Sequence, residues 1–243
     1  MNTAKTIKDP IIVQTDSGYR YSIEPFLLAE FAPLLPGQNV LDIGTGCGII
    51  PLLMVHREPT LKITGIEIQD VGAAEKNISI NQVNIKIVHG DFLEWTTGEE
   101  QFDLIVSNPP YRKINSGRTN PDIGKAIARH EIKLNLPSLL DKAQSLLKKG
   151  GHITLAYPPI RLQETLRELE MRKMFPSRVR FIHGHINAQA KIFLVDAIKE
   201  KKSDLIVESP LYVYNKDESY TQEMQEIYDS FNCVDGTDHI GKK

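Results

Sequence analysis

The sequence predicts an α/β fold with a doubly wound, mostly parallel sheet of seven strands and an antiparallel hairpin at one edge. Two observations carry this prediction. Between residues 39 and 158, short apolar runs of strand length alternate with stretches of helical periodicity, which is typical of a parallel sheet covered by helices. Two further strand-like runs then follow each other too closely for a parallel crossover, so we expect them to pair antiparallel.

The expected elements come in a regular order. Strands are expected at residues 39–44, 62–68, 85–91, 102–108 and 150–158, and the hairpin strands at 178–184 and 190–199. Helices are expected from the glycine-rich turn to about Arg57, and at 73–82, 136–150 and 161–174. We expect Gly150 to end the helix at 136–150 as a C-terminal cap, since glycine tolerates the left-handed conformation found there.

Nothing in the composition divides the chain. No Gly/Ser tract, low-complexity segment or fixed-period repeat is present, so we expect a single domain over residues 1–243. Residues 1–36 would form an N-terminal cap segment, and residues 232–243 lack periodicity and are expected to form a flexible tail. The N-terminus has no apolar leader, no run approaches ~18 apolar residues, and cysteines number only two. We therefore expect a cytoplasmic protein with no membrane partner.

The charges are unevenly distributed. The formal net charge is −2, yet residues 111–202 hold 19 Lys and Arg against 8 Asp and Glu. Such a basic excess fits one face that meets a polyanion such as RNA. It fits equally a solvated surface with charges scattered around the fold, and the sequence leaves both possibilities open.

A glycine-rich turn follows the first strand. The segment "LDIGTGCGII" places Gly44, Gly46 and Gly48 where a tight turn lets a ligand approach the backbone closely. Position 49 is Ile, so the dinucleotide-binding pattern G-x-G-x-x-G is missing. Phosphate is therefore not the favoured ligand.

Acidic residues stand at the ends of three successive strands. Asp42 precedes the glycines, Glu67 ends the second strand and Asp91 ends the third. A carboxylate at the position of Glu67 can accept both hydroxyls of a ribose, while Asp91 and Phe92 can contact the edge and face of an adenine. Any one of these acids could instead be a helix N-cap. Together they favour an adenosine with a positively charged tail and no phosphates, which describes S-adenosylmethionine. The predicted cofactor site comprises Asp42, Gly44, Thr45, Gly46, Gly48, Glu67, Ile68, Asp91, Phe92 and Asn108.

The fourth strand ends in a rigid polar segment, "FDLIVSNPPY", with Asn108, Pro109, Pro110 and Tyr111 at its end. An exocyclic amine is a poor nucleophile because its lone pair is delocalised. If the Asn108 side-chain oxygen and the Pro109 carbonyl each accept one N–H, that lone pair turns toward the methyl donor, and rigid acceptors lose little to reorganisation. Tyr111 can stack on a planar target. A mere strand terminator is the alternative, but this strand and the upstream glycines favour these four residues as the catalytic set.

The motifs "VLDIGTGCGIIPLL", "GIEIQ", "SNPPYRK" and "IARHE" together resemble class I S-adenosylmethionine-dependent methyltransferases. More narrowly, "GYRYSIEPFLLA" and "ARHE" resemble the bacterial tRNA(Val) adenine-37 N6-methyltransferase family, over about residues 13–228. The resemblance implies a Rossmann-like methyltransferase that uses S-adenosylmethionine and acts on tRNA. It also implies that Arg112, Lys113, Arg118 and Arg129 lie against that tRNA. The stretch 183–191 departs from the family pattern.

Two other functions remain as alternatives. The same Asn-Pro-Pro-Tyr segment holds an amide in N5-glutamine methyltransferases that act on release factors, but the first strand begins near residue 39, which leaves no room for their extra N-terminal domain. A non-catalytic RNA-binding module would have no reason to keep an amine-binding platform.

His183 and His185 form an H-x-H pair without an evident third ligand, so we expect no metal, and no obligate protein partner is indicated.

Overall fold

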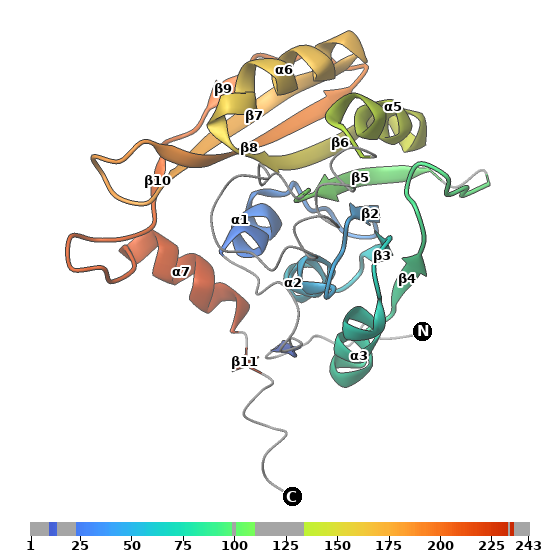
Figure 1. The fold of residues 1–243 in the computed structure, drawn as a ribbon, viewed down its shortest axis with the longest axis horizontal. Helices are drawn as coiled ribbons and strands as arrows, with labels where there is room; N and C mark the ends of the chain where they lie inside the picture. The colour runs from blue at the N-terminus through green and yellow to red at the C-terminus, as the bar shows by residue number, and fades with distance from the viewer. Residues whose placement is uncertain (1–9, 14–22, 99–100, 110–133, 233, 236–243) are drawn as a thin grey trace, which may run out of the picture.

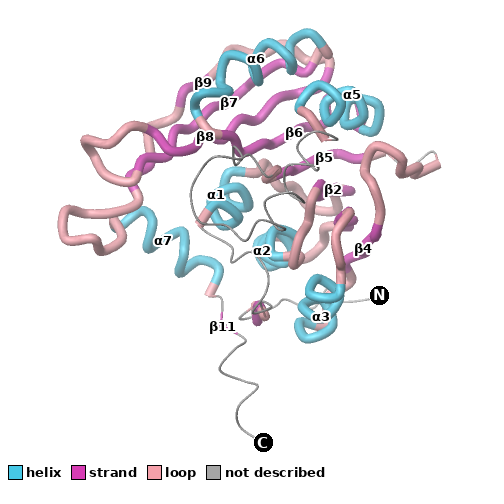
Figure 2. The backbone as a smooth tube through the Cα atoms, in the orientation of Figure 1, coloured by secondary structure: helices cyan, strands magenta, loops and turns pink. Residues whose placement is uncertain are grey.

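The computed structural model describes residues 10–13, 23–98, 101–109, 134–232 and 234–235. Its main sheet has the order β10-β7-β8-β6-β5-β2-β3-β4, and β9 also pairs with β7. Seven of these strands are the predicted ones, and β9 and β10 are two-residue additions along the outer side of β7. Helices cover the sheet on both sides (Figures 1 and 2), so the predicted doubly wound α/β fold is confirmed. The strands are β2 (Asn39–Ile43), β3 (Lys62–Glu67), β4 (Ile85–His89), β5 (Phe102–Ser107), β6 (Leu147–Tyr157), β7 (Met174–His183), β8 (Ala190–Lys199), β9 (Ile206–Val207) and β10 (Leu211–Tyr212).

The helices form two layers. On one side of the sheet lie α1, α2, α3 and α7, and on the other lie α5 and α6 (Figure 1). A separate two-stranded pair, β1 (Ile11–Ile12) with β11 (Val234–Asp235), joins the two ends of the described chain in parallel. The helices are α1 (Glu24–Phe31), α2 (Ile49–Arg57), α3 (Gly72–Asn81), α5 (Leu136–Leu146), α6 (Leu162–Met171) and α7 (Gln222–Phe231), with a 3-10 turn η1 (Pro159–Arg161) before α6.

Alternation along the central strands explains why both faces are covered. In β5, Leu104 and Val106 face the cluster under α1 and α2, whereas Ile105 faces the cluster under α5. Strands with apolar residues on both faces must be buried on both, as parallel sheets are. The inner pairs β2–β3, β2–β5, β3–β4 and β5–β6 are parallel, and β8 runs antiparallel to both β6 and β7. The predicted antiparallel hairpin is thus β7–β8.

The prediction that Gly150 caps a helix over 136–150 is wrong. The helix α5 ends at Leu146, and Leu147 already has the extended conformation that begins β6. Gly150 lies inside β6 with φ +76°, at the point where the register between β5 and β6 shifts. The carbonyls of Gln144 and Leu147 at the end of the helix are bound instead by the Lys199 ammonium, at 2.7 Å each. A cation at a helix C-terminus replaces the glycine cap.

The predicted helix over 161–174 is too long at its C-terminal end. It stops at Met171, Lys173 takes the left-handed conformation with φ 57°, and β7 starts at Met174. The strand therefore begins four residues before the predicted residue 178. Phe175 and Pro176 pair with Ile198 and Ala197 of β8, and this long-range pairing decides the boundary.

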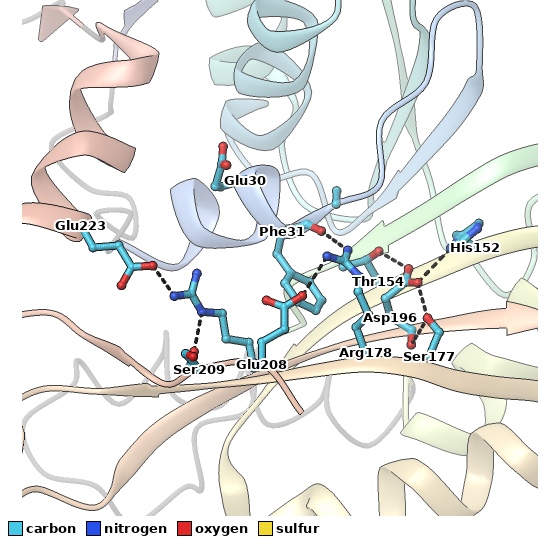
Figure 3. Close-up of polar contacts among 12 residues, drawn as sticks. Glu30, Phe31, His152, Thr154, Ser177, Arg178, Asp196, Glu208, Ser209 and Glu223 are labelled. Atoms are coloured by element: carbon cyan, nitrogen blue, oxygen red, sulfur yellow. Dashed lines mark hydrogen bonds and ion pairs between the residues drawn. The ribbon is translucent and has the colours of Figure 1, made fainter. Parts of the chain in front are cut away.

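A buried polar cluster lies between β6, β7 and β8. The Asp196 carboxylate, only 1% exposed, accepts hydrogen bonds from the hydroxyls of Thr154 (3.0 Å) and Ser177 (2.7 Å). His152 Nδ1 lies 2.9 Å from the same carboxylate (Figure 3). Each carboxylate oxygen thus has a partner, as a buried charge requires.

No helix in the described ranges is long and apolar enough to cross a membrane. Of the segment expected to be a flexible tail, Val234–Asp235 form β11, and 236–243 lie outside the described residues.

Candidate functional site

The predicted site residues that the structure describes lie at or near the carboxyl ends of the parallel strands. In the parallel register, Ile43 of β2 stands opposite Ile66 of β3 and Ser107 of β5. Glu67 stands opposite His89 of β4. The residues that follow these strands therefore leave the sheet at the same level, at the carboxyl ends where ligands bind in open α/β sheets.

No described atom crowds the first two glycines of the loop. Gly44, Gly46 and Gly48 all have positive φ, at +76°, +56° and +78°. A Cβ added at Gly44 or Gly46 would meet no described atom within 4 Å, whereas one at Gly48 would contact Ala74 at 3.4 Å. The first two glycines thus leave room beside the backbone, and the third lets α2 start close to α3.

Glu67 is bound to the glycine loop. Its Oε2 accepts the Gly46 N–H at 2.9 Å, and its Oε1 accepts the Gln69 N–H at 2.9 Å. The side chain is buried at the end of β3. Both oxygens keep further lone pairs, so the carboxylate can hold the loop and still accept hydroxyl groups of a ligand.

Asp42 is a buried acid without a well-formed hydrogen bond. The side chain is fully buried, and neither carboxylate oxygen has a partner among the described residues; the same is true of the Thr45 hydroxyl. Desolvation raises the pKa of Asp42 to about 7, and the charge of Glu67 adds to this rise while the nearby Thr45 hydroxyl opposes it. Unpaired buried polar groups are costly. Their position beneath the glycine loop fits a group that a cationic ligand would complete.

We predict that stability falls with pH because of Asp42. The folded protein keeps this proton up to about pH 7, whereas the unfolded chain loses it near pH 4. Between these values the folded state binds more protons, so the free energy of unfolding decreases as pH rises, by up to about 4 kcal/mol from this group. Urea denaturation from pH 4 to pH 8 should show a slope that Asp42→Asn removes. An identical slope in the variant would assign it to other groups.

Asn108 also carries an unpaired buried atom. Its Oδ1 has no hydrogen-bond partner among the described residues, and Pro109 beside it is buried. The preceding Ser107 is held by its hydroxyl, which donates to the Ile43 carbonyl at 2.8 Å. The Asn108 acceptor therefore sits on a fixed strand end next to the glycine loop, which is the arrangement an incoming N–H group would need.

Asp91 and Phe92 are less available to a ligand than the sequence predicts. Asp91 Oδ1 accepts the Leu93 N–H at 2.9 Å and so closes the turn after β4. The Phe92 ring, 4% exposed, packs in the core cluster under α5. Ile68 is half-buried, with its carbonyl 3.3 Å from His89 Nε2. The contacts proposed for Asp91 and Phe92 stay predictions, and the buried ring makes Phe92 the weaker of the two.

Two residues that position the glycine loop escape sequence reasoning. A Cβ on Gly65, in the middle of β3, would lie 2.7 Å from the Thr45 hydroxyl, so only glycine lets the loop pack there. An isolated glycine inside a strand does signal such a close approach. The fully buried Asn77 on α3 donates to the Cys47 carbonyl in the loop at 3.0 Å. It also accepts the Val13 N–H at 2.8 Å and donates to the Val13 carbonyl at 3.0 Å.

We predict that Asn77→Leu destabilises the protein by about 2–3 kcal/mol, because buried backbone groups of Val13 and Cys47 lose their partners. Affinity for S-adenosylmethionine should fall as well, since the loop loses an anchor. Asn81→Leu is the matched control. The Asn81 amide accepts the backbone N–H of Ile11 (2.8 Å) and donates to the Ile11 carbonyl (2.7 Å), and among the described residues it makes no hydrogen bond to the loop. Denaturation and calorimetry on both variants check this. Equal losses of affinity would show that the N-terminal strand, and not the loop contact, is responsible.

Several predicted residues cannot be placed. Pro110, Tyr111, Arg112, Lys113, Arg118 and Arg129 lie outside the described residues.

Cys47 packs against the core, and burial raises the pKa of its thiol, which disfavours a nucleophilic role. Within the described ranges, no group of three or more His, Cys, Asp or Glu side chains could hold a metal ion.

Some of the basic residues of the 111–202 segment lie at the opposite end of the strands from the glycine loop. Lys148 pairs with Asp103 at 2.7 Å near the start of β6, and Lys199 ends the antiparallel β8 at the same level. Lys201 and Lys202 follow, exposed. These lysines are separated from Gly44 and Asn108 by the length of the strands, so they form no common face with the site.

A cavity of about 150 Å³ lies elsewhere, between α1, α7 and β7. Its two arginines are already paired: Arg178 with Glu208 at 2.9 Å and with the Phe31 carbonyl at 2.7 Å, and Arg180 with Glu223 (Figure 3). Paired charges on the flank of the sheet do not indicate a reactive site, so the strand ends remain the candidate.

Known proteins share both sequence and fold with this chain. The family model described as methyltransferase small domain matches residues 24–177. A protein of Pedobacter heparinus named tRNA1(Val) (adenine(37)-N6)-methyltransferase is 31% identical over 180 residues, 72% of this chain and 74% of that one. A Shewanella woodyi protein of the same name is 29% identical over 245 residues, 94% and 98% of the two chains.

Solved structures agree on the fold. A predicted O-methyltransferase from Agrobacterium tumefaciens superposes with a TM-score of 0.65 at 17% identity, over 87% of this chain and 98% of that one. A methyltransferase from Pyrococcus furiosus gives 0.57 at 22% identity, over 78% and 89%. The chain therefore belongs to the methyltransferase small domain family and, within it, to the family of the tRNA1(Val) (adenine(37)-N6)-methyltransferases.

Proposed function

We propose that this protein transfers a methyl group from S-adenosylmethionine to the exocyclic N6 amine of adenine in RNA, most specifically adenine 37 of tRNA(Val). Residues 1–243 act as one methyltransferase domain, in the cytoplasm where tRNA is found. The observation that carries the proposal is the buried Oδ1 of Asn108, which has no partner among the described residues and follows the strand next to the glycine loop. It supports binding of the substrate amine at the end of β5 and binding of the cofactor at the end of the neighbouring β2.

The residues at the sheet edge fit the cofactor. Gly44 and Gly46 leave room for a ligand beside the backbone, and Glu67 keeps lone pairs for ribose hydroxyls. Asp42, unpaired beneath the loop, suits a positively charged amino-acid tail. When bound, S-adenosylmethionine supplies a methyl group on a cationic sulfur. Because an ionised Asp42 attracts a cationic ligand, the affinity for S-adenosylmethionine should rise with pH as Asp42 loses its proton near pH 7.

The chain's task in the reaction is positioning. Asn108 Oδ1 accepts one N–H of the adenine amine, the Pro109 carbonyl accepts the other, and the nitrogen lone pair is left free to form the new N–C bond. Bound S-adenosylmethionine would supply the methyl group and would keep the electron pair of the broken sulfur–carbon bond, so the transfer needs no other reactant. The amine then releases a proton to solvent, so no strong general base is needed. Proximity and fixed acceptors supply the catalysis.

The test is methyl transfer from labelled S-adenosylmethionine to total unmodified tRNA, followed by nucleoside analysis. Labelled N6-methyladenosine is the expected product, and sequencing then locates the modified nucleotide. Label absent from RNA but present on a glutamine of a release factor would replace this proposal with N5-glutamine methylation. Cofactor binding without any transfer would favour a non-catalytic RNA-binding module.

A further inference from the structure

Two neighbouring strands end in the same way. β5 continues as "SNPPYR" from residue 107, and β6 ends as "AYPPIR" from residue 156. The strands are parallel, and Ser107 stands opposite Leu155. Asn108 and Pro109 therefore leave β5 at the level where β6 ends, one strand spacing away, about 4.8 Å. A second double proline, Pro158–Pro159, thus begins on the neighbouring strand, two residues beyond the position level with Asn108.

The turn after β6 is fixed by several contacts. The Arg161 N–H donates to the Pro158 carbonyl at 2.9 Å and closes the 3-10 turn η1. The Arg161 guanidinium lies 5.0 Å from the centre of the Tyr157 ring, which is buried. The same guanidinium donates to both carboxylate oxygens of Glu164, at 3.1 and 3.0 Å. Prolines and these contacts leave the turn little freedom.

This rigid turn presents an apolar side chain to solvent. Ile160 is 77% exposed, more than any other large apolar residue in the described ranges. Ile186, in the β7–β8 turn at the same edge of the sheet, is 64% exposed. Strand order places β8 between β6 and β7, so the two isoleucines belong to strand ends about 10 Å apart. One exposed isoleucine needs no explanation. Ile160 differs because it is held rigidly after the end of the strand next to Asn108, whose buried Oδ1 has no partner among the described residues.

We propose that the Pro158–Ile160 turn is a second wall of the acceptor site, on which Ile160 packs against the base next to the methylated adenine. A base has an apolar face and polar edges, and enzymes that take a base out of its stack hold it between aromatic or apolar side chains. The inference rests on the proposed function, because it takes the acceptor to be a nucleotide in RNA. It adds a contact for the neighbouring nucleotide, on a strand to which no role has been given.

Steady-state kinetics at saturating S-adenosylmethionine test the wall. The RNA is an anticodon stem-loop transcript carrying the target adenine. Ile160→Ala should raise the KM for this RNA about tenfold, the scale of one stacked base. Ile160→Phe should keep the wild-type KM, because a flat ring can still pack against the base. Cofactor affinity and Tm should match wild type, since the side chain projects into solvent. Ile206→Ala is the control: Ile206 is 58% exposed on β9, beyond β7, and its loss should leave KM unchanged.

A second RNA locates the contact. An abasic residue on one side of the target adenine should raise the wild-type KM about tenfold and add nothing to the Ile160→Ala variant, because the same contact is already lost. Additive effects on both sides of the adenine would overturn the inference, as would a wild-type KM for Ile160→Ala. In either case the wild type would still methylate RNA, and the proposed function would stand. A wild type that transfers no methyl group to RNA would refute the proposed function and this inference together.

Discussion

Asn108→Ala should lower the turnover number for methyl transfer by about 10²- to 10³-fold, the usual cost of losing one preorganised electrostatic group. The unpaired Oδ1 at the end of β5 is the acceptor that the substitution removes. S-adenosylmethionine affinity should hardly change, because the glycine loop and Glu67 do not touch this side chain in the described contacts. Single-turnover kinetics with saturating RNA isolate the chemical step from binding.

A matched asparagine provides the control. Asn135 caps α5, and its Oδ1 accepts the Ser138 N–H at 2.9 Å at the protein surface. Asn135→Ala should cost about 1 kcal/mol of stability and leave turnover unchanged. If Asn108→Ala also turned over near the wild-type rate, the role given to its amide oxygen would be wrong. A loss of cofactor binding as large as the loss of rate would mean that Asn108 acts mainly in the cofactor site, where the sequence also places it, and not on the amine.

Asp196→Ala should be the most destabilising of the substitutions considered, by about 3–5 kcal/mol. The substitution removes the acceptor of Thr154 and Ser177, both buried, and the partner of His152 (Figure 3). The buried Thr154 hydroxyl then loses the partner it has in the described residues. The Ser177 hydroxyl keeps only its longer contact, at 3.2 Å, with the backbone carbonyl of residue 196. A loss of this size is a large part of the 5–15 kcal/mol that holds a typical domain. Urea denaturation with a constant m value measures it.

The isosteric Asp196→Asn separates charge from packing. It keeps one carbonyl oxygen as an acceptor for Thr154 and should cost clearly less than the alanine variant. Ser177→Ala removes only one donor and should cost about 1 kcal/mol. Cofactor affinity at 25 °C should be the same in all folded variants, because this cluster lies between β6, β7 and β8. An Asp196→Ala protein as stable as wild type would mean that the cluster contributes nothing net.

The sequence predicts well what depends on local pattern. The strand runs at 39–44 and 102–108 are recognisable because both faces of β2 and β5 are apolar, and the acids and glycines at their ends come together because parallel strands share an edge. The role of Gly150 is mispredicted because a Lys-Gly-Gly sequence reads as a helix end. In the folded protein, Lys199, 49 residues later, takes the place of the cap.

Long-range contacts are what the sequence conceals. Asn77 lies in a stretch that reads correctly as a helix, but nothing in the helix indicates that its amide reaches both Val13 and Cys47. Phe92 follows a strand end, as a ring stacked on a ligand might be expected to do, yet packing under α5 takes it into the core. The second double proline is visible in the sequence, but only the pairing of β5 with β6 shows that it follows the strand next to Asn108 and Pro109.

The pairing of β1 with β11, together with the hold of Asn77 and Asn81 on residues 11–13, ties both chain ends to one helix. Because Asn77 also holds the Cys47 carbonyl, residues 11–13 share an anchor with the glycine loop. Deleting residues 11–13 therefore removes a support of the loop together with β1. Variants that differ at these residues should not be compared for cofactor affinity as though only a remote strand had changed.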